Sequence, residues 1–173
     1  MEDLSARIAP YLTQGSSGTR ASSAIYADAV LMQDLAASLG ADLAGQVDLV
    51  AAPESMGFIL GSRLASTLGV GFLPMKRGGN SRERGRVRTS SYIDHRDQVQ
   101  TLEVLADLIK PGCRILFVDD WVGTAATVQA AISLFEDCGA TVTKIAAIGA
   151  TYSKVTAGMI DSGMLRYGYL EKN

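Results

Sequence analysis

Short apolar runs that alternate with segments of helical period are the feature that most constrains the fold of this chain. VDLVAA at 47–52 and RILFVD at 114–119 are almost continuously apolar, which is typical of strands covered on both faces. Apolar residues recur at helical spacing in the segment 127–138 that follows. This alternation predicts an α/β fold, with a doubly wound, mostly parallel sheet flanked by helices.

The remaining segments extend the same pattern over a chain of 173 residues, a length that fits one domain, 1–173. The segment 76–91 has no apolar period and reads as a mobile basic loop. We expect further strands at 71–75, 141–152 and 165–170, the last at a sheet edge, and further helices at 22–39, 58–69 and 94–109.

Composition narrows the class of protein. Apolar residues make up 47% of the chain and charged residues 20%, which is ordinary for a globular protein. The net charge of −2 gives no general attraction to nucleic acid or to anionic membranes. Two cysteines, Cys113 and Cys138, make no disulfide framework, and the lone His95 argues against a zinc site. Without a leader or membrane-length apolar run, we expect a cytoplasmic protein.

The stretch ILFVDDWVGTAAT at 115–127 carries the most chemistry. Asp119 and Asp120 follow a buried strand, and a turn of small and hydroxyl-bearing residues comes directly after them. A turn that opens a helix presents free N–H groups and the positive end of the helix dipole, so it binds anions such as phosphate. Carboxylates accept hydrogen bonds from a sugar diol. The spacing therefore suits a ribose 5-phosphate.

Three alternatives bear on this stretch. The acids and threonines could serve only as helix caps, but the buried strand before them and the hydroxyl-rich turn after them favour a binding site. A phospho-receiver domain also ends a strand in paired acids, but most of such a fold follows its acids, whereas here most of the chain precedes them. A dinucleotide-binding fold is disfavoured because no G-x-G-x-x-G follows a strand.

The same stretch resembles the phosphoribosyl-pyrophosphate (PRPP) signature of type I phosphoribosyltransferases, in which a hydrophobic strand and two acids precede two variable residues and A-T-G-G-T. PESMGFILGSRLASTLGVGFLPMKRGGN resembles the pyrophosphate-loop region of adenine phosphoribosyltransferases. Tyr92-Ile93-Asp94-His95 looks like the segment that carries their active-site acid. The resemblance covers roughly residues 45–150, and adenine phosphoribosyltransferase-like members are the most similar in this respect.

The resemblance implies an activity and a set of site residues. The reaction would transfer ribose 5-phosphate from PRPP to a purine base, adenine-like in the first place, and release pyrophosphate. Mg²⁺ would be carried mainly by PRPP oxygens, a small hood would be formed by the chain termini, and a homodimer would be expected. The implied residues are Asp119 and Asp120 on the ribose hydroxyls, Gly123, Thr124, Ala125, Ala126 and Thr127 on the 5-phosphate, Glu54, Ser55 and Met56 in the pyrophosphate loop, and Asp94 as a further catalytic acid.

The basic loop fits the same chemistry. Pyrophosphate leaves with a heavy negative charge, so cations such as Lys76 and Arg77 aimed at it would assist departure. A glycine-containing loop could also close over PRPP and exclude water. The alternatives are a solvated basic loop and an RNA-binding patch, although no aromatic residues interleave with the arginines to stack bases.

Three further residues are candidates for the site, and two of them, Asp94 and Trp121, keep two interpretations each. Asp94 would either cap the predicted helix 94–109 or lie near the sugar and the base, where it stabilises positive charge or manages a proton. His95 could do the same work near neutral pH. Trp121 would serve either in packing or in substrate stacking.

The chain departs from the family pattern at three places. Ala125 and Ala126 replace Gly-Gly, Met56 replaces an arginine, and the N-terminus lacks the F-P-x-P-G and R-D-I elements associated with adenine recognition. An alanine forced to positive φ costs about 1–2 kcal/mol. These departures leave the base open. They also support an alternative, a regulator that binds PRPP or a nucleotide with little or no transfer.

Overall fold

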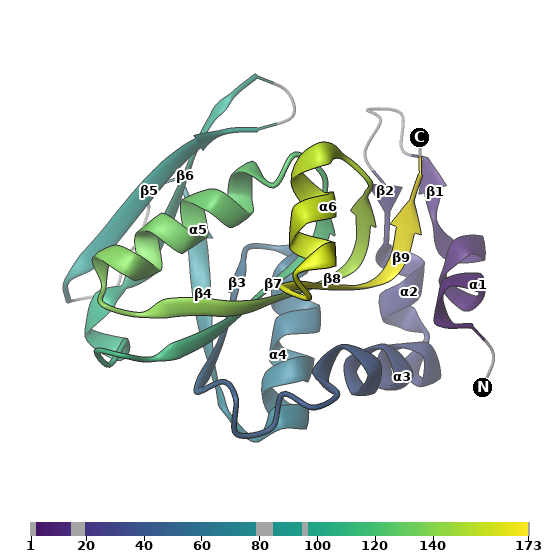
Figure 1. The fold of residues 1–173 in the computed structure, drawn as a ribbon, viewed down its shortest axis with the longest axis horizontal. Coiled ribbons are helices and arrows are strands. Elements are labelled where there is room, and N and C mark those ends of the chain that lie inside the picture. Colours follow the sequence, from purple (N-terminus) through teal and green to yellow (C-terminus); the bar gives the residue numbers. More distant parts are fainter. Residues whose placement is uncertain (1–2, 15–19, 79–84, 95–96, 173) are drawn as a thin grey trace.

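A seven-stranded mixed sheet forms the centre of the molecule (Figure 1). The structure, a computed structural model, describes residues 3–14, 20–78, 85–94 and 97–172. The strand order is β5-β6-β4-β3-β7-β8-β9, and the last five strands of this order are mutually parallel. The bounds are β3 (Leu49–Pro53), β4 (Gly71–Arg77), β5 (Val87–Ile93), β6 (Val99–Leu105), β7 (Arg114–Val122), β8 (Thr141–Thr151) and β9 (Leu165–Glu171). The predicted α/β fold with a mostly parallel sheet is confirmed.

Helices cover both faces of this sheet. On one face lie α5 (Ala126–Asp137) and α6 (Lys154–Asp161), and on the other lie α1 (Leu4–Ile8), α3 (Ala29–Gly40) and α4 (Met56–Leu68) (Figure 1). Successive side chains of β7 point to opposite faces, so Phe117 packs in the core beneath α5 while Leu116 packs in the core beneath α3 and α4. Within the described ranges, every helix falls short of the length and apolarity that crossing a membrane requires.

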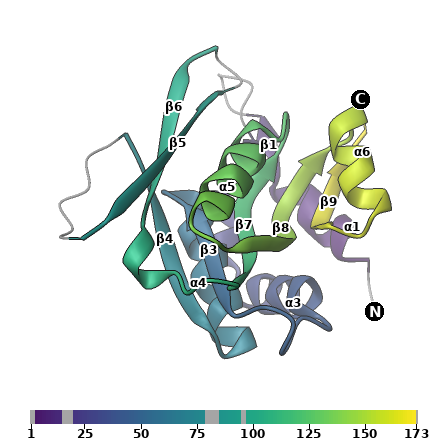
Figure 2. The ribbon, with the colours of Figure 1, turned by 60° about the vertical axis from the view of Figure 1, so that its left-hand side comes forward.

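Several short N-terminal elements precede the sheet, and the first of them, α1, lies beside β9, at the opposite end of the sheet from the β5–β6 hairpin (Figure 2). They are α1, a 3-10 turn η1 (Ala9–Tyr11), a two-stranded ribbon of β1 (Thr13–Gln14) and β2 (Arg20–Ala21), and α2 (Ser23–Ala27). Gly168 of β9 lets α1 approach closely, because a Cβ there would lie 2.5 Å from Ile8 Cδ1. The two ends of the chain therefore meet on one side of the molecule, as the expected hood requires.

The helix predicted for 94–109 is wrong. This segment contains β6 and a 3-10 turn, η2 (Ala106–Leu108), and β6 pairs antiparallel with both β5 and β4. A turn at Asp97, where φ is +57°, reverses the chain between β5 and β6. The apolar spacing of this segment is also compatible with a strand that buries Leu102 and Val104 on one face. The segment forms a strand rather than a helix because β4 and β5 supply hydrogen-bonding partners on both sides.

Two further boundaries differ from expectation. The helix predicted for 22–39 is two helices, because Asp28 is extended and its side chain caps α3 by accepting a hydrogen bond from Leu31 N at 2.9 Å. The segment predicted as a loop, 76–91, begins inside β4 and ends inside β5. Residues 79–84 lie outside the described part of the chain, so closure of this segment over a ligand stays a prediction.

Candidate active site

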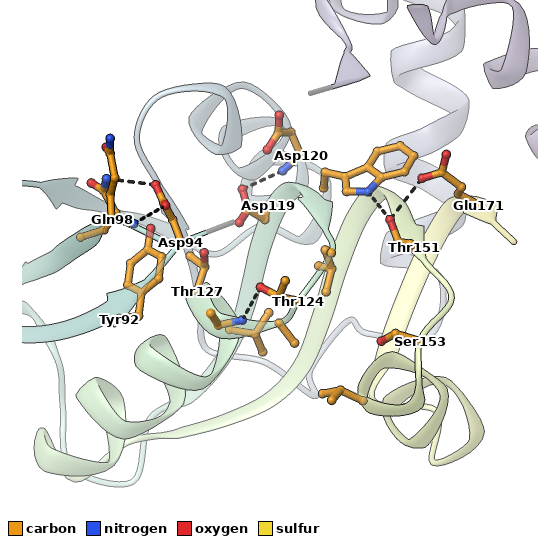
Figure 3. A pocket seen from close by; sticks show the side chains of 18 of the residues that line it. Tyr92, Asp94, Gln98, Asp119, Asp120, Thr124, Thr127, Thr151, Ser153 and Glu171 are labelled. Carbon is orange, nitrogen blue, oxygen red and sulfur yellow. Dashed lines mark hydrogen bonds between the residues drawn. The ribbon is translucent and has the colours of Figure 1, made fainter. Parts of the chain in front are cut away.

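A cavity of about 1030 Å³ lies at the edge of the sheet where the parallel strands end (Figure 3). It collects the ends of four strands, β4, β7, β8 and β9, together with the start of α5 and the β5–β6 hairpin. Ligands of open α/β sheets bind at this edge. The lining residues are Arg77, Tyr92, Asp94, Gln98, Gln100, all residues from Asp119 to Val128, Thr151, Ser153, Val155 and Glu171.

The two acids lie in the last part of β7, at the centre of the cavity floor (Figure 3). Asp119 is 5% exposed and accepts a hydrogen bond from Asp120 N at 2.9 Å, while Asp120 is half-buried. Burial and then the charge of Asp120 raise the pKa of Asp119 well above its usual range, and Arg77 only partly offsets this. A pair of carboxylates held this way would gain from a ligand that brings hydrogen-bond donors, such as a sugar diol.

The turn after the acids leads into α5 and lines the cavity with small residues. Ala125 is left-handed, with φ of +62° and ψ of +11°, and Ala126 is already the first residue of the helix. Ala126 N donates a long hydrogen bond of 3.4 Å to Thr124 Oγ1. The N–H groups of Thr127 and Val128 belong to the first helical turn, which has no intrahelical acceptors. The turn therefore offers an anion both N–H groups and the threonine hydroxyls.

The predicted pyrophosphate loop lies beside the cavity rather than in its wall. Glu54, Ser55 and Met56 do not line the cavity, and neither does Lys76 of β4. The Glu54 carboxylate accepts a hydrogen bond from Arg77 N at 3.1 Å. Because Arg77 itself lines the cavity, this bond ties the loop after β3 to the cationic end of β4.

Tyr26 of α2 contacts this loop, a role that the sequence did not predict. Its hydroxyl donates to Met56 O at 3.3 Å. Burial raises the pKa of Tyr26, and the charges of Asp120 and Asp119 raise it further. In the sequence a single tyrosine on a short helix looks like an ordinary packing residue.

Asp94 lies at the turn of the β5–β6 hairpin and faces the cavity (Figure 3). Its two carboxylate oxygens accept hydrogen bonds from Gln98 N at 3.0 Å and from Gln100 Nε2 at 3.1 Å. No helix begins here, so the interpretation of Asp94 as a helix cap is wrong. His95 lies outside the described residues.

The opposite wall comes from β8, β9 and the start of α6. Sequence reasoning missed its residues Thr151, Ser153, Val155 and Glu171, because they lie at the ends of β8 and β9 or at the start of α6, where the sequence carries no recognisable motif. Thr151 accepts a hydrogen bond from the indole N–H of Trp121 at 2.9 Å and donates one to Glu171 at 3.2 Å. In Figure 3, Asp94 and Gln98 lie on one side of the acid pair, and Thr151 and Glu171 on the other.

Comparisons with known proteins identify the family of this chain. A relative from Leuconostoc citreum named adenine phosphoribosyltransferase is 40% identical over 115 residues, 66% of this chain and 63% of that protein. The chain therefore spans less than two thirds of that relative's length. The crystal structure of adenine phosphoribosyltransferase from Thermoanaerobacter pseudethanolicus superposes with a TM-score of 0.82 at 25% identity, covering 95% of this chain and 98% of that one.

The crystal structure of the enzyme from Giardia lamblia, complexed with 9-deazaadenine, has a TM-score of 0.84 at 22% identity and covers 100% of both chains. At this identity the likeness shows the fold alone. Residues 23–159, more than half of the chain, match the phosphoribosyl transferase domain, and they include the acid pair and the turn after it. The resemblance seen in the sequence is thereby confirmed, and the chain belongs to the phosphoribosyltransferase family.

Proposed function

We propose that this protein transfers ribose 5-phosphate from PRPP to a purine base, adenine-like in the first place, and releases pyrophosphate. The observation that carries the proposal is that the acid pair and the open first turn of α5 line one cavity. In the reaction the bond from the sugar C1 to the pyrophosphate oxygen breaks, a bond from C1 to a base nitrogen forms, and that nitrogen loses its proton. The relative named adenine phosphoribosyltransferase supports adenine as the acceptor.

The ribose 5-phosphate half of PRPP would be held by β7 and α5. Asp119 and Asp120 would accept hydrogen bonds from the ribose hydroxyls. The 5-phosphate would lie on the N–H groups and hydroxyls of the turn, from Gly123 through Thr124, Ala125 and Ala126 to Thr127. Like charges would thus be kept apart along the cavity, because the acids would face the neutral diol while the phosphate lies on the turn.

The pyrophosphate half would lie toward β3 and β4. Arg77 lines the cavity there, and Lys76 precedes it in the same strand. Their positive charge would stabilise the negative charge that builds up on the departing oxygens. Glu54, Ser55 and Met56 would lie next to this group, positioned by the hydrogen bond that Arg77 N donates to the Glu54 carboxylate.

Asp94 would act near C1 and the base, either by stabilising the cationic sugar carbon or by accepting the base proton. Its hydrogen bonds to Gln98 and Gln100 fix the direction of the carboxylate. Asp94 thus completes the proposed catalytic set with Asp119 and Asp120.

Mg²⁺ fits these residues as a substrate-borne ion. The described residues contain no group of three or more potential metal ligands, but the cavity floor carries the carboxylates of Asp119 and Asp120. These two side chains would be available to an ion held mainly by PRPP oxygens and water. Such an ion would neutralise charge on the leaving pyrophosphate.

Two further features belong to the proposal. A homodimer is supported by the outer end of the β5–β6 hairpin, where Ile93 is 60% exposed and its register partner Val99 is 73% exposed. Sedimentation of a monomeric mass at micromolar concentration would contradict it.

A cytoplasmic location is supported by the free thiols of Cys113 and Cys138, which persist in a reducing compartment.

A regulator that binds PRPP without transfer is the second candidate, and Met56 favours it. The uncharged thioether stands where the family pattern places a cation, so the leaving group would receive less assistance. The deciding assay mixes the protein with PRPP, Mg²⁺ and a panel of purine bases and measures pyrophosphate. We expect release with at least one base, adenine first. Saturable PRPP binding with no release for any base would establish the regulator instead.

The site itself is tested by Asp119→Asn combined with Asp120→Asn. Each asparagine keeps the size of the side chain but loses a charged acceptor for the diol. We expect PRPP affinity to fall by at least about a hundredfold while the circular dichroism spectrum is unchanged. Calorimetry that shows wild-type affinity would refute the ribose assignment.

A further inference from the structure

Two contacts and one supporting hydrogen bond hold the Trp121 side chain in the wall of the cavity. Its indole N–H donates to Thr151 Oγ1 at 2.9 Å, and Thr151 in turn donates to Glu171 at 3.2 Å. The ring of Tyr169 lies 6.3 Å away between centroids, at an interplanar angle of 40°. The indole is therefore fixed by residues of β8 and β9 while it remains half-buried and lines the cavity.

Gly149 provides the space for this ring. It is the register partner of Trp121 in β8, and a Cβ at this position would lie 2.2 Å from the Cζ3 atom of the indole. No side chain larger than hydrogen fits there without moving the ring. The strand pair is thus shaped around an aromatic residue at position 121, which argues that the ring has a defined position rather than a loose surface one.

The position of the ring follows from the strand order. Arg77 and the loop after β3 lie on the β3–β4 side of β7, and the Trp121 ring leans to the β8–β9 side. Displacement at a carbon requires the incoming group and the leaving group on opposite sides of that carbon. If pyrophosphate departs toward Arg77, the acceptor base approaches C1 from the side of Trp121.

We infer that Trp121 is the platform on which the acceptor base stacks, and that Thr151 and Glu171 are positioning residues that hold the indole for it. The inference rests on the proposed function and extends it to the acceptor. An aromatic face binds every nucleobase through its π-face, so the platform supplies affinity, while groups at the base edge must supply the choice among bases.

Trp121 is the single tryptophan of the chain, which gives a direct test by fluorescence. Excitation at the red edge of indole absorption, where purine bases do not absorb, reports only this ring. We expect adenine, added to protein saturated with PRPP and Mg²⁺ or with pyrophosphate and ribose 5-phosphate, to quench the emission saturably. Turnover of adenine with an unchanged emission spectrum would overturn the inference.

Steady-state kinetics with substitutions separate the platform from its supports. For Trp121→Leu we expect KM for the base to rise about tenfold, with KM for PRPP within about twofold of wild type, and Trp121→Phe to restore most of the loss. Thr151→Val keeps the shape but removes the acceptor of the indole N–H, so KM for the base should rise about threefold and the emission should shift. Tyr152→Phe, exposed and outside the cavity, is the matched control.

The outcomes distinguish this inference from the proposed function. If the wild-type protein binds no PRPP and releases no pyrophosphate with any base, the proposed function fails. If it turns over a base but Trp121→Leu, folded by circular dichroism, leaves KM for that base unchanged, only the platform fails. If Trp121→Leu does not fold, KM for the base in Thr151→Val decides the same question.

Discussion

Two neighbouring units of the sheet, β3–α4 and β7–α5, have the same construction and different chemistry. Both are a buried parallel strand, a short loop and a helix, and they pair in register from Leu49 opposite Ile115. The β7 unit ends in two carboxylates and an open helix start that line the cavity. The β3 unit ends in Ala52 and Pro53, and its loop lies outside the cavity wall.

In the proposed function, this difference would adapt one architecture to two halves of a ligand. The loop after β7 offers groups directly to a ligand, because its small residues leave the backbone of the α5 start accessible. The loop after β3 is braced by protein atoms, through Glu54 on Arg77 N and Tyr26 on Met56 O. In the proposed site the ribose phosphate would contact its unit directly, whereas the pyrophosphate would depend on Arg77.

Met56→Arg would make the two units more alike and should have the largest effect of the single substitutions that compare them. The substitution places a cation where the family pattern has one, and guanidinium groups bind phosphate oxygens strongly. We expect calorimetry to show about tenfold tighter binding of PRPP. Met56→Leu, which is similar in size and uncharged, should leave the affinity unchanged. Equal affinity for the arginine variant would mean that this loop does not face pyrophosphate.

Asp119→Asn should remove the free-energy cost of a buried, ionised carboxyl, which only the β7 unit contains. Because the folded state raises the pKa of Asp119, folding favours the protonated form of this carboxyl. The stability that the protonated carboxyl allows is fully present at low pH, and it is lost as the pH rises from about 4 through the raised pKa of Asp119. Asparagine does not ionise, and its Oδ1 can still accept the bond from Asp120 N.

The variant should therefore unfold with a free energy on the order of 1 kcal/mol higher than wild type at neutral pH, and with an equal one in acid. Urea denaturation across this pH range measures both values. A stability difference that stays constant with pH would show that the ionisation of Asp119 is not its source.

The smallest effect concerns Ala125 and Ala126, which replace the two glycines of the family motif. Ala126→Gly should lower the free energy of unfolding by about 0.5–1 kcal/mol, because Ala126 is helical and glycine is a poor helix former. Ala125→Gly should be nearly neutral, since relief of the left-handed conformation offsets the loss of a buried methyl group and the added freedom of the unfolded chain. Equal losses in urea denaturation would contradict this distinction.

Much of the fold was accessible from local patterns. The strands β3, β7 and β8 were predicted because each is a run of buried apolar residues, and α4 ends at Gly69, which adopts a left-handed conformation. The β5–β6 hairpin was missed because the apolar residues of 94–109 satisfy a helical and an alternating pattern about equally. The strands β4 and β5, which pair with β6 on its two sides, decide between the two patterns.

The candidate site likewise contains residues that the sequence predicted and residues that it could not predict. The residues from Asp119 to Thr127 were predicted as a group because they are contiguous, so their proximity is guaranteed by the chain itself. Tyr26, Thr151 and Glu171 could not be predicted, because each comes from a separate element and carries no motif. Their contacts with Met56 and Trp121 depend on how α2, β8 and β9 pack.

The sequence by itself determined the α/β class, the family and an acid pair followed by a turn that we propose to bind phosphate, since these depend on local order along the chain. Tertiary structure alone decided that Ala125 and not Ala126 is left-handed, that Asp94 lies in a hairpin turn, and that Trp121 leans toward β8 and β9. The reason is physical. Backbone conformation at a turn and the direction of a side chain are set by hydrogen-bond partners and space supplied by distant segments, such as Gly149 beneath the indole.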